Sequence, residues 1–285
     1  MGGAALGFSR ASYHRAMTTE VVDFAAEWQA WHDARERRLR DLRAFLSVTG
    51  LHWLTEEPQR FEDVPGAWSS GADGVVVVLA EGEALRVGED EIAGRHVFGA
   101  VDGAGVWAEF AGATGPWTSV VEIADRFGSA ILRPRHLDSP NLSSYEGTPA
   151  FAVDPRWRVE ARWEPFETPQ ATSVGTVVDG ATSTFTALGT FAFDLDGPRR
   201  LLAFDDGDGG LWILFRDATA GSTTYVIRQL QTSAPRADGT VTLDFNRAAN
   251  MPCAYTPYAT CPLPPPENVL PVAIAAGEKV PVVRR

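Results

Sequence analysis

The chain has 285 residues, 45% of them hydrophobic, and its 9 Trp and 15 Phe are enough for a sizeable core. Its formal net charge of -12 comes from acids spread along the sequence, which disfavours phosphate backbones and anionic lipid headgroups as partners. We therefore expect a globular protein that binds neither nucleic acid nor a membrane.

The first part of the chain predicts an extension followed by one amphipathic helix. Residues 1–17 lack the apolar run of a secretory signal, so we expect a disordered extension on a cytoplasmic protein. Thr18 and Thr19 are suitable helix caps, and apolar side chains then recur with a period near 3.6 as far as Leu42. This stripe is expected to cover one end of a sheet. The charged run 35–41 also fits an anion site, but we interpret it as a solvated helix face.

Beyond the helix the sequence is typical of a β protein. Short runs rich in Val, Thr and Phe alternate with Gly, Asp and Pro turns from Phe61 to Leu132 and again from Trp157 to Phe245. We predict a mainly β fold, either an antiparallel barrel or a sandwich, with residues 18–285 forming a single domain. The intervening segment lacks a regular period, and such loops often border a pocket. Its polar and aromatic residues are Arg135, His136, Asp138, Asn141 and Tyr145.

The C-terminal segment 250–279 is rich in proline, which prevents regular strand pairing. We expect it to wrap over the barrel or sandwich and to be ordered by packing. It contains both cysteines, Cys253 and Cys261, which in a cytoplasmic protein are more often thiols than a bridge. Two cysteines supply only half of the ligands that a zinc ion usually takes, so no metal site is predicted there.

The strongest polar constellation runs from Arg216 to Arg228. Arg228 falls in a predicted strand with apolar residues on both faces, and a buried guanidinium needs a carboxylate or an anionic ligand. Asp217 or Asp244 could pair with either arginine. Two interpretations stay open: a structural ion-pair network inside the sheet, or a polar pocket for a small anionic or hydroxylated ligand.

The second interpretation assigns roles to individual residues. The catalytic candidates are Asp217, Asp244 and Glu278, and a glutamate beside a polar pocket is a ready general base. Asp244 would orient Arg228, and the arginines would hold a carboxylate or a phosphate. The ligand-binding candidates are Arg216, Thr223, Tyr225, Arg228, Asn246, Arg247 and Asn250. The predicted function is thus the binding of a small anionic metabolite, with catalysis on it left open.

The segment from Leu243 to Asn268, together with residues 276–279, resembles the signature of the uncharacterised prokaryotic family catalogued as domain of unknown function 1684. Residues 50–54 and the turn 216–228 match its other marks. The family pattern usually reads Asn-Pro-Pro-Cys where this chain has Asn-Met-Pro-Cys, at residues 250–253. The resemblance implies no established activity, cofactor or mechanism.

Sequence motifs of familiar enzymes are absent. The chain has no Gly-x-Ser-x-Gly elbow, no His-Glu-x-x-His helix, no P-loop and no dinucleotide fingerprint. One alternative is a metal-assisted hydrolase that uses His52 with Asp217, Asp244 or Glu278. A flavin-binding barrel and a structural or interaction domain without a ligand are the others. The cofactor and the oligomeric state stay unknown from the sequence.

Overall fold

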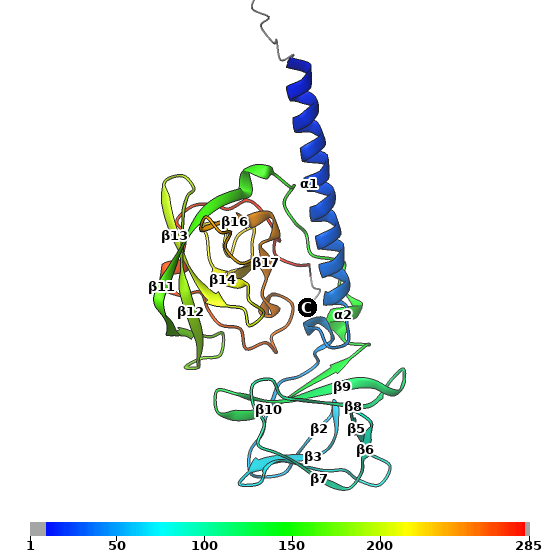
Figure 1. Cartoon of the computed structure of the whole chain (residues 1–285). Helices are drawn as coiled ribbons and strands as arrows, with labels where there is room; N and C mark the ends of the chain where they lie inside the picture. The colour runs from blue at the N-terminus through cyan, green and yellow to red at the C-terminus, as the bar shows by residue number, and fades with distance from the viewer. Residues whose placement is uncertain (1–9, 283–285) are drawn as a thin grey trace, which may run out of the picture.

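The structure is a computed structural model that describes residues 10–282, with side chains from Phe24 onward. One β lobe lies beside a long helix, and another β lobe lies beyond the C-terminal end of that helix (Figure 1). The fold is mainly β, with three antiparallel sheets, and none of the sheets closes into a barrel within the described residues. The predicted disorder of residues 1–17 stays a prediction, because residues 1–9 lie outside the described part and residues 10–17 begin the helix.

Helix α1 (Arg10–Leu39) contacts the second lobe through Phe24 and Trp28. Phe24 and Trp28 are buried, and the Trp28 indole nitrogen donates a hydrogen bond to the backbone oxygen of Asn246 at 2.6 Å. The helix begins ahead of the predicted cap at Thr18, so that boundary was wrong. No helix within residues 10–282 combines the length and the apolar character needed to cross a bilayer.

The first lobe contains two sheets that share one core around the fully buried Trp68. Their strand orders are β1-β10-β9-β8-β5-β6 and β2-β3-β4-β7, and the consecutive strands β2–β4 and β8–β10 pair in antiparallel fashion, as expected of a meander. The strands are β1 (His52–Trp53), β2 (Gln59–Phe61), β3 (Val64–Gly71), β4 (Gly74–Val78), β5 (Leu85–Val87), β6 (Asp90–Ile92), β7 (Arg95–Gly99), β8 (Val106–Gly112), β9 (Gly115–Arg126) and β10 (Ser129–His136).

The second lobe is one curled sheet with the order β16-β11-β12-β13-β14-β15-β17. Its core contains Phe191, Phe215 and Phe245, and whether it forms one domain with the first lobe stays a prediction. The strands are β11 (Arg158–Gly175), β12 (Thr182–Asp194), β13 (Pro198–Asp205), β14 (Leu211–Phe215), β15 (Arg228–Thr232), β16 (Thr240–Asp244) and β17 (Ala249–Asn250).

The predicted strand from Thr224 to Leu230 starts too early. Before β15 the chain makes a turn in which the backbone nitrogen and the hydroxyl of Thr219 both donate to Asp217 Oδ1, at 2.8 and 2.6 Å. The Thr219 oxygen also contacts the Thr224 hydroxyl at 2.8 Å. Such local side-chain hydrogen bonds compete with strand pairing, so the ladder resumes only at Arg228.

The C-terminal segment is ordered by packing, as predicted. Asn268 is fully buried and bridges two strands, because its Oδ1 accepts from Leu202 N at 2.6 Å and its Nδ2 donates to the Leu202 and Leu214 oxygens. Cys253 and Cys261 are buried thiols. The short helices are η1 (Phe45–Ser47), α2 (Pro140–Ser143), η2 (Pro155–Trp157), η3 (Phe245–Arg247), η4 (Pro252–Ala254) and η5 (Pro266–Asn268).

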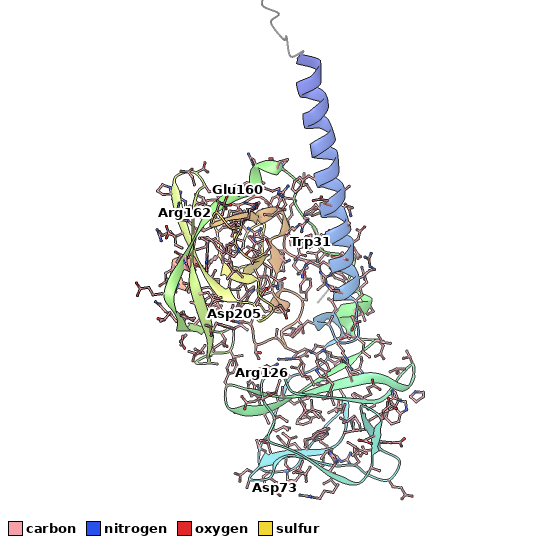
Figure 2. All side chains as sticks on the ribbon, viewed as in Figure 1. Trp31, Asp73, Arg126, Glu160, Arg162 and Asp205 are labelled. Atoms are coloured by element: carbon pink, nitrogen blue, oxygen red, sulfur yellow. The ribbon has the colours of Figure 1, made fainter. Side chains whose placement is uncertain are left out.

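Buried charges lie where the two lobes meet. Arg133 and Arg135 of β10 are 1% and 2% exposed, and both donate to Glu122 Oε2 of β9, at 2.9 and 2.8 Å. Arg133 Nε also donates to the backbone oxygen of Tyr258 in the C-terminal segment. Arg126, at the edge of the first lobe that faces the second (Figure 2), donates to the other Glu122 oxygen. One carboxylate thus joins three guanidinium groups.

Candidate functional site

Arg228 and Asp217, the centre of the sequence-predicted pocket, form a closed ion pair. Both side chains are 1% exposed, and Arg228 Nη2 lies 2.5 Å from Asp217 Oδ2. Arg228 also donates to the backbone oxygens of Ile274 and Ala276. Burial tends to raise the pKa of Asp217, but the Arg228 charge and the Thr219 hydrogen bonds hold it below its usual value. The geometry corresponds to the structural ion-pair interpretation.

The other predicted site residues are dispersed. Asp244 does not orient Arg228, which is a correction to the predicted arrangement. Its carboxylate accepts from Asn246 N and Nδ2 and lies 3.6 Å from Arg247 Nε. These contacts serve the turn at the end of β16 and the docking of helix α1. Arg216 and Thr223 are exposed, and the Tyr225 hydroxyl donates to the Cys253 oxygen at 2.9 Å.

Glu278 and Asn250 do meet, around an arginine that comes from helix α1. Glu278 is fully buried and accepts from Arg35 Nε, from Arg35 Nη2 at 3.0 Å and from the Asn250 backbone nitrogen at 2.6 Å. The Tyr255 hydroxyl donates to the same carboxylate at 3.3 Å. Arg35 Nη2 also donates to the Asn250 oxygen at 3.0 Å. Burial tends to lower the pKa of Arg35, but the charge and hydrogen bonds of Glu278, together with the contribution of Tyr255, raise that pKa above its ordinary value.

A cavity of about 140 Å³ lies beside this cluster, between the end of α1 and the second lobe. Arg35, Arg38, Gln229 and Asn250 supply its polar lining, and none of the described residues that line it is a carboxylate. The apolar and aromatic part of the lining is Leu39, Ala44, Phe45, Pro252 and Tyr255. The sequence interpretation missed the two arginines because it treated the charged run of the helix as solvated. Their spacing of three residues, which places both on one helix face, was the available signal.

Several donors of this lining have no partner among the described residues. Arg35 uses Nε and Nη2 but not Nη1, and the exposed side chain of Arg38 makes no ion pair or hydrogen bond with the described residues. The Gln229 carbonyl accepts from the Trp212 indole nitrogen at 2.8 Å, which leaves the Gln229 amide nitrogen free. The Asn250 amide nitrogen donates to the Lys279 oxygen at 2.8 Å, while its Oδ1 is buried without a partner. The cavity therefore has an excess of hydrogen-bond donors.

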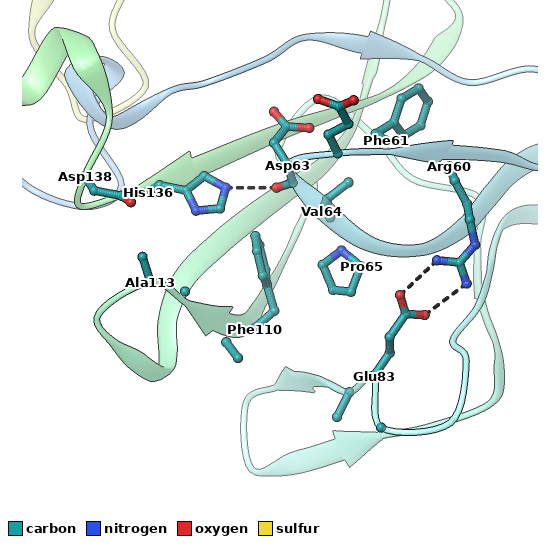
Figure 3. A pocket seen from close by; sticks show the side chains of 15 residues that line it. Arg60, Phe61, Asp63, Val64, Pro65, Glu83, Phe110, Ala113, His136 and Asp138 are labelled. Carbon is teal, nitrogen blue, oxygen red and sulfur yellow. Dashed lines mark hydrogen bonds and ion pairs between the residues drawn. The ribbon is translucent and has the colours of Figure 1, made fainter.

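A larger hollow of about 510 Å³ lies in the first lobe (Figure 3), and His136 and Asp138 line it as the loop prediction expected. Both ring nitrogens of His136 have partners. Nδ1 lies 2.8 Å from the Ser119 hydroxyl and Nε2 lies 2.8 Å from the Asp63 backbone oxygen. At the far side Arg60 forms a bidentate pair with Glu83. These side chains hold strands and turns together and leave no spare group on the histidine.

The residues of the metal hypothesis do not assemble. His52 Nε2 lies 2.7 Å from Asp63 Oδ1, whereas Asp217 and Glu278 are each held by their own arginine. Within the part of the chain that the structure describes, no three His, Cys, Asp or Glu side chains are grouped as metal ligands. Asn141 of the predicted pocket loop lines a third hollow of about 490 Å³ at the lobe junction, and no charged residue lines that one.

Comparison with known proteins places the second half of the chain in a family. A family model described as "Protein of unknown function (DUF1684)" matches residues 143–279. An uncharacterised protein from Haloarcula marismortui, solved by solution NMR, is 37% identical; the match covers 48% of this chain and 78% of that one, with a TM-score of 0.41. No curated protein matches the chain. Through residues 143–279, which include Asn250, Tyr255 and Glu278, the chain belongs to the DUF1684 family of proteins of unknown function.

Proposed function

We propose that this protein binds a small anionic metabolite in the cavity between the end of helix α1 and the second lobe. The observation that carries the proposal is a lining with two guanidinium groups, unused donors and no carboxylate. Charge-assisted hydrogen bonds from a guanidinium to a carboxylate or phosphate are stronger than neutral ones, and the planar fork of arginine fits both groups. The ligand class is the one predicted from the sequence, but the proposed binding site is this cavity and not the surroundings of Arg228.

The size of the cavity narrows the ligand. Its volume of about 140 Å³ equals that of roughly four or five water molecules at about 30 Å³ each. Pockets for drug-sized ligands are usually about 300–1,000 Å³, so the cavity is too small to enclose a whole nucleotide or flavin. A carboxylic acid of a few carbon atoms, a sulfate or a phosphate does fit.

Glu278 has a positioning role in this proposal rather than the predicted role of general base. Its two oxygens accept from Arg35, the Asn250 backbone nitrogen and the Tyr255 hydroxyl. These hydrogen bonds hold the carboxylate in one orientation. The carboxylate fixes the Arg35 guanidinium so that Nη1, which has no partner among the described residues, is available to a ligand.

Titration calorimetry with acetate, glycolate, sulfate and phosphate tests the proposal. Arg38→Ala should weaken binding by at least about tenfold, because a hydrogen bond to a charged group contributes about 1.5–3 kcal/mol. Arg37→Ala is the matched control, since Arg37 is an exposed neighbour on the same helix turn that does not line the cavity. Equal losses in the two variants, or no binding of any of the four anions to the unaltered protein, would refute the proposal.

A further inference from the structure

Three hydroxyl groups form an unbroken chain between two carboxylates beside the proposed cavity. The Tyr145 hydroxyl donates to Glu36 Oε1 at 2.8 Å and contacts the Thr148 hydroxyl. The Thr148 oxygen lies 3.1 Å from the Tyr255 hydroxyl, which lies 3.3 Å from Glu278 Oε2. Tyr145, Thr148 and Tyr255 are all at most 5% exposed. The chain joins helix α1, the loop before β11 and the C-terminal segment.

The two ends of the hydroxyl chain lie at different hollows. Glu36 and Thr148 line a surface hollow of about 600 Å³ that also includes His32, Asp33 and Glu146. Tyr255 lines the small cavity, where Arg35 contacts Glu278. The chain is therefore a continuous series of oxygen–oxygen contacts from the surface hollow to the wall of the cavity.

The hydroxyl chain has fewer protons than oxygen–oxygen links. Four oxygen–oxygen links join Glu36, Tyr145, Thr148, Tyr255 and Glu278, but the three hydroxyl groups carry one proton each. Burial raises the pKa of both tyrosines above the ordinary value, so both keep their protons at neutral pH. With both carboxylates ionised, one link has no proton, and two oxygen lone pairs face each other there. A fourth proton would complete the chain.

We infer that binding of an anion in the cavity is coupled to uptake of a proton by this hydroxyl chain, an inference that rests on the proposed function. The anion adds negative charge beside Tyr255 and Glu278, and a nearby negative charge favours the protonated form of neighbouring groups. Linkage requires the reverse effect as well, so protonation of the chain strengthens anion binding. The proton enters from the surface hollow and bonds to a Glu36 oxygen, and the hydroxyl groups turn toward the next oxygen of the chain, so that each of the four links then has one proton.

Other charged groups face the chain and are common to all variants of the test. Arg40 donates to the Tyr145 backbone oxygen at 3.3 Å, and its guanidinium lies over the Tyr145 ring. Arg35 contacts the Glu278 end, and Lys279 follows Glu278 in sequence. His32, Asp33 and Glu146 line the surface hollow. Only the substitutions below change the balance of protons and links.

Thr148→Val removes one proton and two links while it keeps the shape of the side chain and the Thr148 backbone hydrogen bond to Glu36. The two remaining links then have two protons, so no place for another is left. Tyr145→Phe gives the same balance by removing the first two links. Thr256→Val is the matched control, because Thr256 is also a buried threonine, 3% exposed, with its hydroxyl outside the chain.

Titration calorimetry at neutral pH in two buffers of different ionisation enthalpy measures the proton uptake directly. Acetate and sulfate are the probes, because both are fully ionised at that pH and bring no proton. The unaltered protein and Thr256→Val should take up a measurable fraction of one proton per anion. Thr148→Val and Tyr145→Phe should bind the same anions with no uptake. Binding without proton uptake in the unaltered protein, or proton uptake that persists in both Thr148→Val and Tyr145→Phe, overturns this inference and leaves the proposed function standing. Failure of both anions to bind overturns the proposed function with it.

Discussion

The second lobe and the lobe junction both bury arginine, but they neutralise it differently. In the second lobe one arginine, Arg228, is matched by one carboxylate, Asp217. At the junction Arg133 and Arg135 share the carboxylate of Glu122, which also accepts from Arg126. The first arrangement is a neutral pair inside one lobe, and the second has an excess of positive charge between two lobes.

Aromatic rings contact the excess positive charge at the junction. The Arg135 guanidinium lies 4.5 Å from the centre of the Trp107 ring and 5.4 Å from that of Phe45, and aromatic faces attract cations. Burial lowers the pKa of Arg135 to about 10, against the opposing effect of Glu122. Arg135 Nε has no hydrogen-bond partner in the described part of the chain. The comparison shows that the junction depends more heavily on a single carboxylate than the interior of the second lobe does.

The largest effect is expected from Glu122→Gln. The substitution leaves two buried guanidinium groups without a counter-charge. Breaking a buried ion pair costs about 3–5 kcal/mol, and we expect the free energy of unfolding to fall by an amount at the upper end of that range. Urea unfolding measures the loss. Glu109→Gln on the adjacent strand β8 is the control, because the Glu109–Arg86 pair is partly exposed and its loss should cost far less. Similar costs for the two variants would contradict the special role of Glu122.

A smaller but still large effect is expected from Asp217→Asn. The substitution keeps the shape and the acceptor for Thr219, but it leaves the single guanidinium of Arg228 unpaired, so unfolding should become easier by about 3–4 kcal/mol. The same urea experiment applies, with Asp244→Asn as the control because the Asp244 ion contacts are longer, at 3.6 and 3.9 Å. A cost above that of Glu122→Gln would reverse the comparison.

The smallest effect is expected from Arg126→Ala. Arg126 is the most exposed of the three arginines on Glu122, at 21%, and exposed ion pairs contribute about 0–1 kcal/mol. Glu122 keeps its two buried partners, so the stability should change little and the excess charge at the junction should fall. A loss as large as that of Glu122→Gln would show that Arg126 belongs to the buried cluster energetically.

The sequence predicted that Arg228 needs a charged partner, but it did not predict which carboxylate is that partner. Arg228 was recognised as a buried charge because its predicted strand carries apolar residues on both faces, and that prediction is confirmed. The sequence left Asp217 and Asp244 as alternatives, since strand alternation indicates a face and not a distance. The turn at Thr219 brings Asp217 to Arg228, and Asp244 instead caps the next turn.

Local patterns in the sequence determined the mainly β fold, the N-terminal helix, the packed proline-rich segment and the loop that borders several hollows. These features depend on periodicity and backbone restrictions that act over a few residues. The cavity and the Arg35–Glu278 pair were decided only by the tertiary structure, because those two residues lie 243 positions apart. Hydrogen bonding across that separation depends on how the helix docks on the folded second lobe, which no local pattern records.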